Sequence, residues 1–218
     1  AAVDKGDKKR GAVNGQKDAG CREEHPVVCS LDEVSFRYER NTGDVLRQVS
    51  LDIYANEILM INGSNGCGKS TMLSLIANVY RPYSGKLRIA KNLRTGMLPQ
   101  NPELLFTRRS VRDELIDAND RQQLAEIVRF CRLEELLDRH PYDLSGGEKQ
   151  RLALAKVLIA DPDILLMDEP TKGLDNGFKM QLADMLRKLQ KCGKTIVVVS
   201  HDIEFCAVAG DRVALLFD

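Results

Sequence analysis

The sequence Gly63-Ser64-Asn65-Gly66-Cys67-Gly68-Lys69-Ser70-Thr71 matches the phosphate-loop pattern G-x-x-x-x-G-K-[ST]. An apolar run precedes it at residues 58–61, and apolar residues with helical spacing follow it from Met72 to Ile76. These flanks predict a strand, a glycine-rich loop and a helix, which is the setting in which the pattern binds phosphate. They disfavour the alternative of a chance match on a tight turn. We therefore expect all nine residues to contact a nucleoside triphosphate.

The residue types of this loop suit phosphate chemistry. Glycines let the backbone curl so that successive N–H groups point at phosphate oxygens, and the N-terminal end of the helix adds positive potential. Lys69 can reach the β- and γ-phosphates, and the Ser70 hydroxyl can bind Mg²⁺. Cys67 has two interpretations: a small residue at a variable position, or a thiol activated by Lys69 and the helix N-terminus.

The composition limits the classes of protein that fit this site. The chain has 218 residues, and its 32 basic residues balance its 32 acidic residues. This length fits one domain, or one domain with a subdomain, and the zero net charge does not favour direct contact with nucleic acid. No apolar run approaches the ~20 residues of a membrane-spanning helix, so any role at a membrane would go through a partner. The six cysteines are scattered, which fits a reducing cytosol.

The sequence predicts a tail and one α/β domain. Residues 1–25 are polar, and we expect a flexible linker or tail, although their basic cluster would also suit a nucleic-acid contact. Residues 26–218 are predicted to form a phosphate-loop NTPase core with a mainly parallel sheet, an N-terminal antiparallel β subdomain and an inserted α-helical subdomain at about residues 101–160. The signals are period-two alternation at 34–38 and 49–53, short strands at 86–89 and 95–98, amphipathic helical spacing within 111–138, and apolar runs at 164–167, 196–199 and 213–217.

Asp168-Glu169 closes the apolar run at residues 164–167. An acid at the carboxyl end of a buried strand can reach the phosphate loop, which we expect on the neighbouring strand. Asp168 then suits an Mg²⁺ ligand, and Glu169 can polarise a water for attack on the γ-phosphate. The alternative is a surface pair of acids at the start of a loop, and the presence of the phosphate loop disfavours it.

The sequence Leu144-Ser145-Gly146-Gly147-Glu148-Lys149-Gln150 is the second decisive motif. Ser145 and Glu148 have the spacing of a capping box, so Ser145 could simply cap a helix that begins here. Two glycines in the first turn are poor helix formers, however, and they leave backbone N–H groups open to close approach by a phosphate. Both roles remain open for Ser145 from the sequence alone.

The ordered motifs resemble those of ATP-binding-cassette ATPases over about residues 28–218. The matching features are the phosphate loop, Gln100, the motif at 144–150, Asp168-Glu169, Gly173-Leu174-Asp175 and Ser200-His201-Asp202. Any one of these would be weak, and their shared order makes the resemblance specific.

The resemblance implies roles for individual residues. Tyr38 matches the aromatic residue that stacks on adenine, although its alternating neighbours also fit a strand core residue. Gln100 matches the glutamine that contacts Mg²⁺ and leads into the helical subdomain, rather than an ordinary exposed loop residue. His201 matches the histidine that contacts the γ-phosphate, where a lone histidine would usually be structural.

The resemblance also implies a composite site. Ser145, Gly146 and Gly147 of one cassette would clamp the ATP held by the phosphate loop of a second cassette, and Asp175 would lie at the interface between them. Binding of ATP would close the pair and hydrolysis would release it.

The closer resemblance is to the C-terminal cassette of tandem energy-coupling-factor importers of the cobalt and thiamine-precursor type, carried by residues 168–175 and 199–207. It implies an ATPase that docks on an integral membrane subunit at the cytoplasmic face of the cell membrane. We expect the chain to be a fragment, with residues 1–25 linking it to a first cassette. The alternative is a non-transport cassette acting on ribosomes or DNA, which the short helical insertion and zero net charge disfavour.

Overall fold

The computed structural model describes residues 25–116 and 121–217, so the predicted linker lies almost wholly outside the described residues. The centre of the domain is a five-stranded parallel sheet. Its order is β5 (Thr95–Leu98), β6 (Ile164–Asp168), β7 (Thr195–Val199), β3 (Ile58–Gly63) and β8 (Arg212–Leu216). The three C-terminal apolar runs are therefore parallel strands, as their composition predicts, and β5 joins them at one edge.

The expected position of Asp168 needs one correction. Strand β6 does not neighbour β3, which leads into the phosphate loop, because β7 lies between them. All three strands run in the same direction, so their carboxyl ends still meet at one edge of the sheet. The acidic pair and the loop are thus two strands apart but lie on the same edge.

A three-stranded antiparallel sheet precedes and follows the phosphate loop in sequence. Its order is β2 (Leu46–Tyr54), β1 (Val27–Phe36) and β4 (Ser84–Ile89). In β2 the alternation has its expected cause, since Val49, Leu51 and Ile53 are buried while Ser50 and Asp52 between them are exposed. In β1 the alternation expected at 34–38 is not found, because Val34, Ser35 and Phe36 are all buried and Tyr38 lies beyond the strand. The antiparallel β subdomain predicted from the alternation is confirmed.

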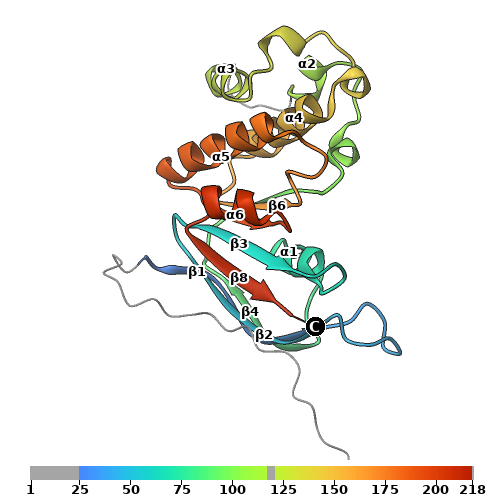
Figure 1. Ribbon diagram of the computed structural model, residues 1–218, viewed down its shortest axis with the longest axis vertical. Coiled ribbons are helices and arrows are strands. Elements are labelled where there is room, and N and C mark those ends of the chain that lie inside the picture. Colours follow the sequence, from blue (N-terminus) through green and yellow to red (C-terminus); the bar gives the residue numbers. More distant parts are fainter. Residues whose placement is uncertain (1–24, 117–120, 218) are drawn as a thin grey trace, which may run out of the picture.

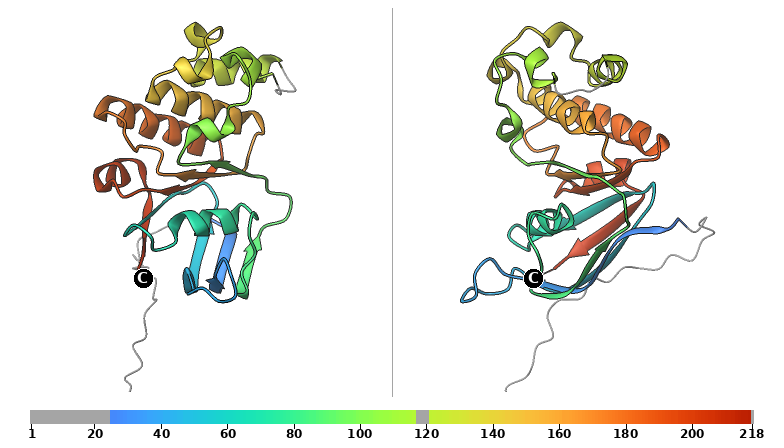
Figure 2. Two further views of the ribbon diagram at one scale, coloured as in Figure 1. Left: turned by 90° about the vertical axis from the view of Figure 1, so that its right-hand side faces the viewer. Right: turned by 180° about the vertical axis from the view of Figure 1, so that it is seen from behind.

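The parallel sheet lies between a layer of helices and the antiparallel sheet (Figure 1). Alternate residues of its inner strands β6, β7 and β3 enter two apolar cores, so both faces of these strands are buried, whereas the edge strand β8 buries one face only. Ile58 and Met60 of β3 pack on the side of α4 (Gly146–Ile159), α5 (Asn176–Lys191) and α6 (Ile203–Ala209). Leu59 and Ile61 pack on the opposite side, against α1 (Lys69–Ile76) and the antiparallel sheet. Figure 2 shows α1 beside the antiparallel strands, below the central sheet. Continuous apolar strands are required wherever both faces are covered in this way.

The helical arm, residues 102–159, forms the upper end of the molecule in Figure 1. Its helix α3 (Arg121–Phe130) buries Ile127 and Val128, as the amphipathic spacing predicts. The rest of the predicted helical segment is divided into short pieces: η1 (Pro102–Leu105), α2 (Val111–Glu114), η2 (Glu134–Leu136) and η3 (Pro141–Asp143). Among the described residues, no helix combines the length and the apolar character needed to cross a bilayer.

Two lysines of α4 hold η1 against that helix. Lys149 Nζ lies 2.7 Å from Glu103 Oε1, and Lys156 Nζ donates to the carbonyl oxygen of Leu105 at 2.5 Å. Lys156 also forms an ion pair with Glu114 of α2. The side chain of Glu114 is fully buried, and its Oε1 accepts hydrogen bonds from backbone N–H groups of residues 107 and 108 at 2.5 and 2.6 Å. One buried carboxylate therefore joins three parts of the arm.

We predict that Glu114→Ala lowers the free energy of unfolding by about 3–5 kcal/mol, because it leaves the Lys156 ammonium and two backbone donors without their acceptor. Urea unfolding followed by circular dichroism measures this change. The matched control is Glu126→Ala on the exposed face of α3, where we expect a change below about 0.5 kcal/mol. Equal effects of the two substitutions would contradict the role given to Glu114.

Candidate functional site

The phosphate loop has the strand–loop–helix setting that its sequence predicts. Strand β3 ends at Gly63 and α1 begins at Lys69. Gly66 and Gly68 have φ values of 88° and 94°, which L side chains rarely adopt. A Cβ on Gly68 would also lie 2.9 Å from the carbonyl oxygen of Val45, so glycine allows the segment before β2 to pack against the loop. The backbone of the loop is thus fixed by its glycines and by a second segment.

Lys69 lies inside the loop. Its Nζ donates to the carbonyl oxygens of Gly63 and Ser64, both at 2.8 Å, and the residue is buried. The loop therefore holds a positive charge at its centre, where it can meet phosphate oxygens. Cys67 is also buried, and it packs in the apolar core between the two sheets. This packing favours the interpretation of Cys67 as a small residue that fits, rather than as an accessible thiol.

Asp168 faces the start of α1. Burial raises the pKa of its carboxyl, a hydrogen bond from Ser70 lowers it, and the negative charge of Glu169 raises it again. Its Oδ1 is buried and has no hydrogen-bond partner in the part of the chain that the structure describes. A buried carboxylate oxygen without a partner, next to a hydroxyl, is a donor set that a hard cation such as Mg²⁺ prefers. The residues therefore fit the metal that the sequence predicts.

Glu169 and His201 form a hydrogen-bonded pair beside Asp168. His201 Nδ1 lies 2.7 Å from Glu169 Oε2, and the backbone N–H of His201 donates to the same oxygen at 3.4 Å. Glu169 adopts φ 48°, an uncommon value for a non-glycine residue, and its N–H donates to the carbonyl oxygen of Val199 at 2.9 Å. Glu169 is buried and the His201 side chain is 60% exposed. The pair thus joins the ends of β6 and β7, with the imidazole open to solvent.

Tyr38 lies beyond the end of β1, so it is not a strand core residue. It is 56% exposed, and its hydroxyl is 2.9 Å from Thr71 Oγ1 in the first turn of α1. Gln100 follows β5 and is exposed. The hydrogen bonds described for Lys69, Thr71 and Asp168 do not include Gln100. The structure therefore brings Tyr38 to the loop and does not show such a contact for Gln100.

The motif at residues 144–150 forms a second cluster of predicted site residues. Ser145 caps α4 through a complete capping box with Glu148, in which Ser145 N–H donates to Glu148 Oε2 at 2.7 Å. These bonds to Ser145 hold the pKa of the Glu148 carboxyl below its usual value. Asp175 caps α5 through a single side-chain hydrogen bond, in which its Oδ1 accepts from the Phe178 N–H at 2.8 Å. Ser145 therefore caps α4, and this contact does not decide whether Ser145 also binds a phosphate.

Both helix starts open into one hollow of about 550 Å³. No residue of the phosphate loop lines it. Its lining residues are Arg132, Ser145, Gly146, Gly147, Glu148, Arg151, Gly173, Leu174, Asp175, Gly177, Phe178 and Gln181. Within the described chain, the predicted site residues are thus divided between two separate places.

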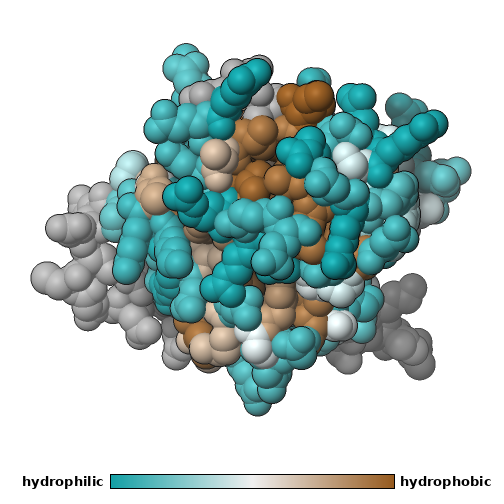
Figure 3. Space-filling model, turned by 90° about the horizontal axis from the view of Figure 1, so that it is seen from above, coloured by the Kyte–Doolittle hydropathy of each residue, from teal (hydrophilic) through white to brown (hydrophobic). Residues whose placement is uncertain are grey.

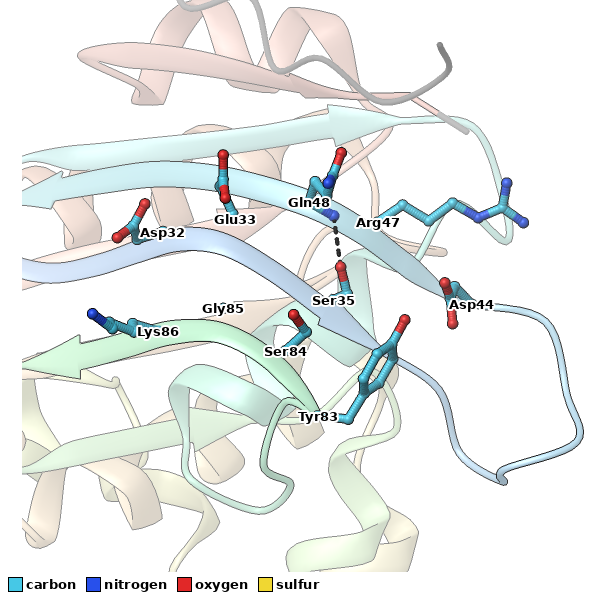
Figure 4. A pocket seen from close by; sticks show the side chains of 10 residues that line it. All are labelled: Asp32, Glu33, Ser35, Asp44, Arg47, Gln48, Tyr83, Ser84, Gly85 and Lys86. Carbon is cyan, nitrogen blue, oxygen red and sulfur yellow. Dashed lines mark hydrogen bonds between the residues drawn. The ribbon is translucent and has the colours of Figure 1, made fainter. Parts of the chain in front are cut away.

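A further hollow of about 620 Å³ lies on the outer face of the antiparallel sheet (Figure 4). Residues of β1, β2, β4 and the segments beside them line it, and none of the predicted site residues is among them. Tyr83 borders it, with the Arg37 guanidinium 4.3 Å from the centre of the ring. This hollow takes no part in the site described above.

Comparison with known proteins identifies the family. The family model described as ABC transporter matches residues 46–172, from the start of β2 to just after the acidic pair. The chain belongs to the ABC transporter ATP-binding family. The resemblance drawn from the ordered motifs is therefore confirmed, as is the fold class.

Relatives and solved structures agree with this assignment. An ABC transporter ATP-binding protein of Clostridium tetani is 35% identical over 209 residues, which cover 88% of this chain and 48% of the relative. The chain thus spans about half the length of that protein. The structure of cbiO1 from Clostridium perfringens, part of the ABC transporter complex cbiONQ, matches with a TM-score of 0.79 and 25% identity over 87% of this chain and 84% of that one. The dimeric bacterial ABC transporter cassette MJ0796 matches with a TM-score of 0.73 and 28% identity over 87% of this chain and 94% of that one.

Sequence reasoning missed two residues near these centres. Arg132 lines the hollow at Ser145, but its place depends on how the helical arm packs on α5, which no local pattern encodes. Tyr80 packs against Tyr38, with ring centres 5.5 Å apart. The scarcity of aromatic residues, at 5% of the chain, was the one available signal for Tyr80.

We predict opposite effects of Asp168→Asn on stability and on nucleotide binding. The raised pKa means that folding disfavours the charged carboxylate, so the neutral amide should raise the free energy of unfolding at pH 7, where an unfolded aspartate is ionised. Affinity for Mg²⁺-ATP should fall by at least about tenfold, the loss that even outer-shell metal partners cause.

Thermal unfolding and isothermal titration calorimetry measure the two effects. Asp184→Asn, on the exposed face of α5, is the matched control and should change neither. A loss of stability in Asp168→Asn with unchanged affinity would contradict the prediction.

Proposed function

We propose that this chain is the ATP-binding and hydrolysing cassette of an ABC importer, acting at the cytoplasmic face of the cell membrane through an integral membrane subunit. The main support for ATPase activity is the buried Glu169, which is hydrogen-bonded to His201 at the same sheet edge as the phosphate loop. In this proposal residues 26–218 form the ATPase domain, with the helical subdomain at about residues 101–160.

The proposed reaction is an in-line hydrolysis. Glu169 accepts a proton from a water as the water oxygen attacks the γ-phosphorus, the bond to the bridging oxygen breaks, and ADP leaves with that electron pair. His201 orients Glu169 and presents its exposed ring nitrogen to the γ-phosphate. Lys69 places its positive charge on the phosphate oxygens.

Asp168, Ser70 and Gln100 would hold Mg²⁺, and the bound ion would neutralise charge on the phosphates. Asp168 supports this role through its buried, partnerless oxygen, and Ser70 through its hydrogen bond to Asp168. Gln100 has this role only by resemblance. It lies exposed in the segment after β5.

A second cassette completes the proposed site. The hollow at Ser145, Gly146 and Gly147 contains no residue of the phosphate loop, which supports a nucleotide site shared between two cassettes. Pairing with a second cassette would bring this hollow to the partner's loop, with Asp175 at the interface. The dimeric arrangement of the related cassette MJ0796 supports the pairing. The partner is either a second copy or the other half of a tandem energy-coupling-factor ATPase.

The helical arm offers a surface for the membrane subunit. Seen from above, this end of the molecule shows apolar side chains gathered inside a hydrophilic surround (Figure 3). Leu104 and Ile116 of the arm are 72% and 64% exposed. Exposed apolar patches of this kind mark interaction sites on otherwise polar surfaces. The likeness to cbiO1, a part of the cbiONQ complex, supports such an assembly.

We predict that Glu169→Gln lowers ATP hydrolysis by about 10²–10⁴-fold while ATP binding persists, because the amide cannot accept the proton of water. Phosphate release and calorimetry measure the two properties, and size-exclusion chromatography should show an ATP-bound pair. Glu204→Gln, on the exposed start of α6, is the matched control and should hydrolyse ATP normally. Hydrolysis at the wild-type rate by Glu169→Gln would overturn the assignment.

We predict that Gly146→Ala separates folding from function. The added methyl would meet only Leu174 Cδ2, at 3.7 Å, so stability should stay unchanged or rise by up to about 1 kcal/mol. Hydrolysis should fall by about tenfold or more, because the methyl keeps a phosphate from the helix start and removes a charge-assisted hydrogen bond.

Binding of ATP to the single chain is the internal control, since Gly146 lies apart from the chain's own phosphate loop. Unchanged hydrolysis in a folded Gly146→Ala protein would argue against the composite site.

A further inference from the structure

Three aromatic rings meet beside the phosphate loop. The ring of Tyr38 packs edge-to-face against Phe36, with centres 5.1 Å apart and planes at 86°, and against Tyr80, at 5.5 Å and 89°. Phe36 and Tyr80 also contact each other, at 5.5 Å. The whole sequence contains six phenylalanines, five tyrosines and no tryptophan, so this group uses a large share of its aromatic side chains. Perpendicular packing from two neighbours fixes the plane of the Tyr38 ring.

The far end of the same ring is fixed by a hydrogen bond. The Tyr38 hydroxyl lies 2.9 Å from the Thr71 hydroxyl, which is buried in the first turn of α1. Gly68 lies against Val45, so the segment between β1 and β2 touches the loop at a second point. Tyr38 is therefore held in orientation by its neighbours and in position by the phosphate loop itself.

Tyr80 reaches this group because the chain reverses direction directly after α1. Asn78, with φ 58°, reverses the chain after the helix. The N–H groups of Val79 and Tyr80 then donate to the carbonyl oxygen of Ser74, at 2.9 and 3.4 Å. The segment 69–80 thus supplies Thr71 from the first turn of α1 and Tyr80 from the turn that follows the helix. The contacts of Tyr38 with Thr71 and with Tyr80 both come from this segment.

We propose that Tyr80 is a positioning residue for the nucleotide base: with Phe36 it fixes the plane of the Tyr38 ring, and the hydroxyl of Thr71 sets the distance of that ring from the phosphates. The inference rests on the proposed function, because it takes Tyr38 as the ring on which adenine stacks. Tyr38 and Tyr80 are 56% and 40% exposed, so the cluster retains open aromatic surface for a base. A base gains more affinity from stacking when its platform is already oriented, because less ordering is needed on binding.

Two ligands separate base recognition from phosphate recognition. Calorimetry with Mg²⁺ compares the affinity of the chain for ATP with its affinity for inorganic tripolyphosphate, which has no base. Tyr80→Leu should weaken ATP binding about threefold to tenfold and leave tripolyphosphate binding unchanged, because it removes the ring contacts with Tyr38 and Phe36 and no phosphate contact. Tyr80→Phe keeps the ring and should bind ATP as the wild type does. Tyr142→Leu, at an exposed tyrosine of the arm, is the matched control and should change neither affinity.

Tyr38→Phe gives a second measurement that does not remove a ring. It breaks the bond to Thr71 and should weaken ATP binding about twofold to tenfold with little effect on tripolyphosphate. Unchanged ATP affinity in Tyr80→Leu, or equal weakening of both ligands, would overturn the inference. Failure of the wild-type chain to bind either ligand would instead overturn the proposed function.

Discussion

Val199 is the residue through which the site is assembled. In the parallel sheet it pairs with Asp168 of β6 on one side and with Ile61 of β3 on the other. These two pairings bring the acidic residues and the phosphate loop to one edge, although their strands are not neighbours. The pairing holds because alternate residues of β6, β7 and β3 enter different apolar cores, and a slip by one residue would exchange the two faces. The chemistry of the site therefore depends on a register that apolar packing maintains.

The sheet edge that carries the site also holds buried ionisable residues, including Asp168 and Lys69. Asp168 is buried beside Glu169, and both its burial and its neighbour oppose ionisation. Lys69 is buried within the loop and bonds only to backbone carbonyl oxygens in the contacts described above. The buried Asp168 carboxylate lowers the stability of the chain, and such a group is retained where a metal or a charged ligand compensates for it. Stability and function are thus opposed at this edge, while the Glu114 cluster in the arm serves stability.

Motifs that act over a few residues were predictable from the sequence, and relations between distant segments were not. The phosphate loop and the capping box of Ser145 depend on φ angles and hydrogen bonds within one turn, so their patterns specify them. The place of β7 between β3 and β6 depends on the order in which strands add to a sheet, which apolar runs alone do not encode. The bond between Tyr38 and Thr71 joins residues 33 positions apart, and it required the packing of two subdomains to become visible.

The contacts between α4 and η1 restrict how these two segments of the arm can move relative to each other. Lys149 and Lys156 hold η1 at two points about two helical turns apart, and the second point is tied to a carboxylate that has no access to water. Sliding η1 along α4 would break the Glu103–Lys149 ion pair and the Leu105–Lys156 hydrogen bond at the same time, so we expect the two segments to move together. A displacement of the chain just after Gln100 is then expected to displace α4, the helix capped by Ser145, in the same direction.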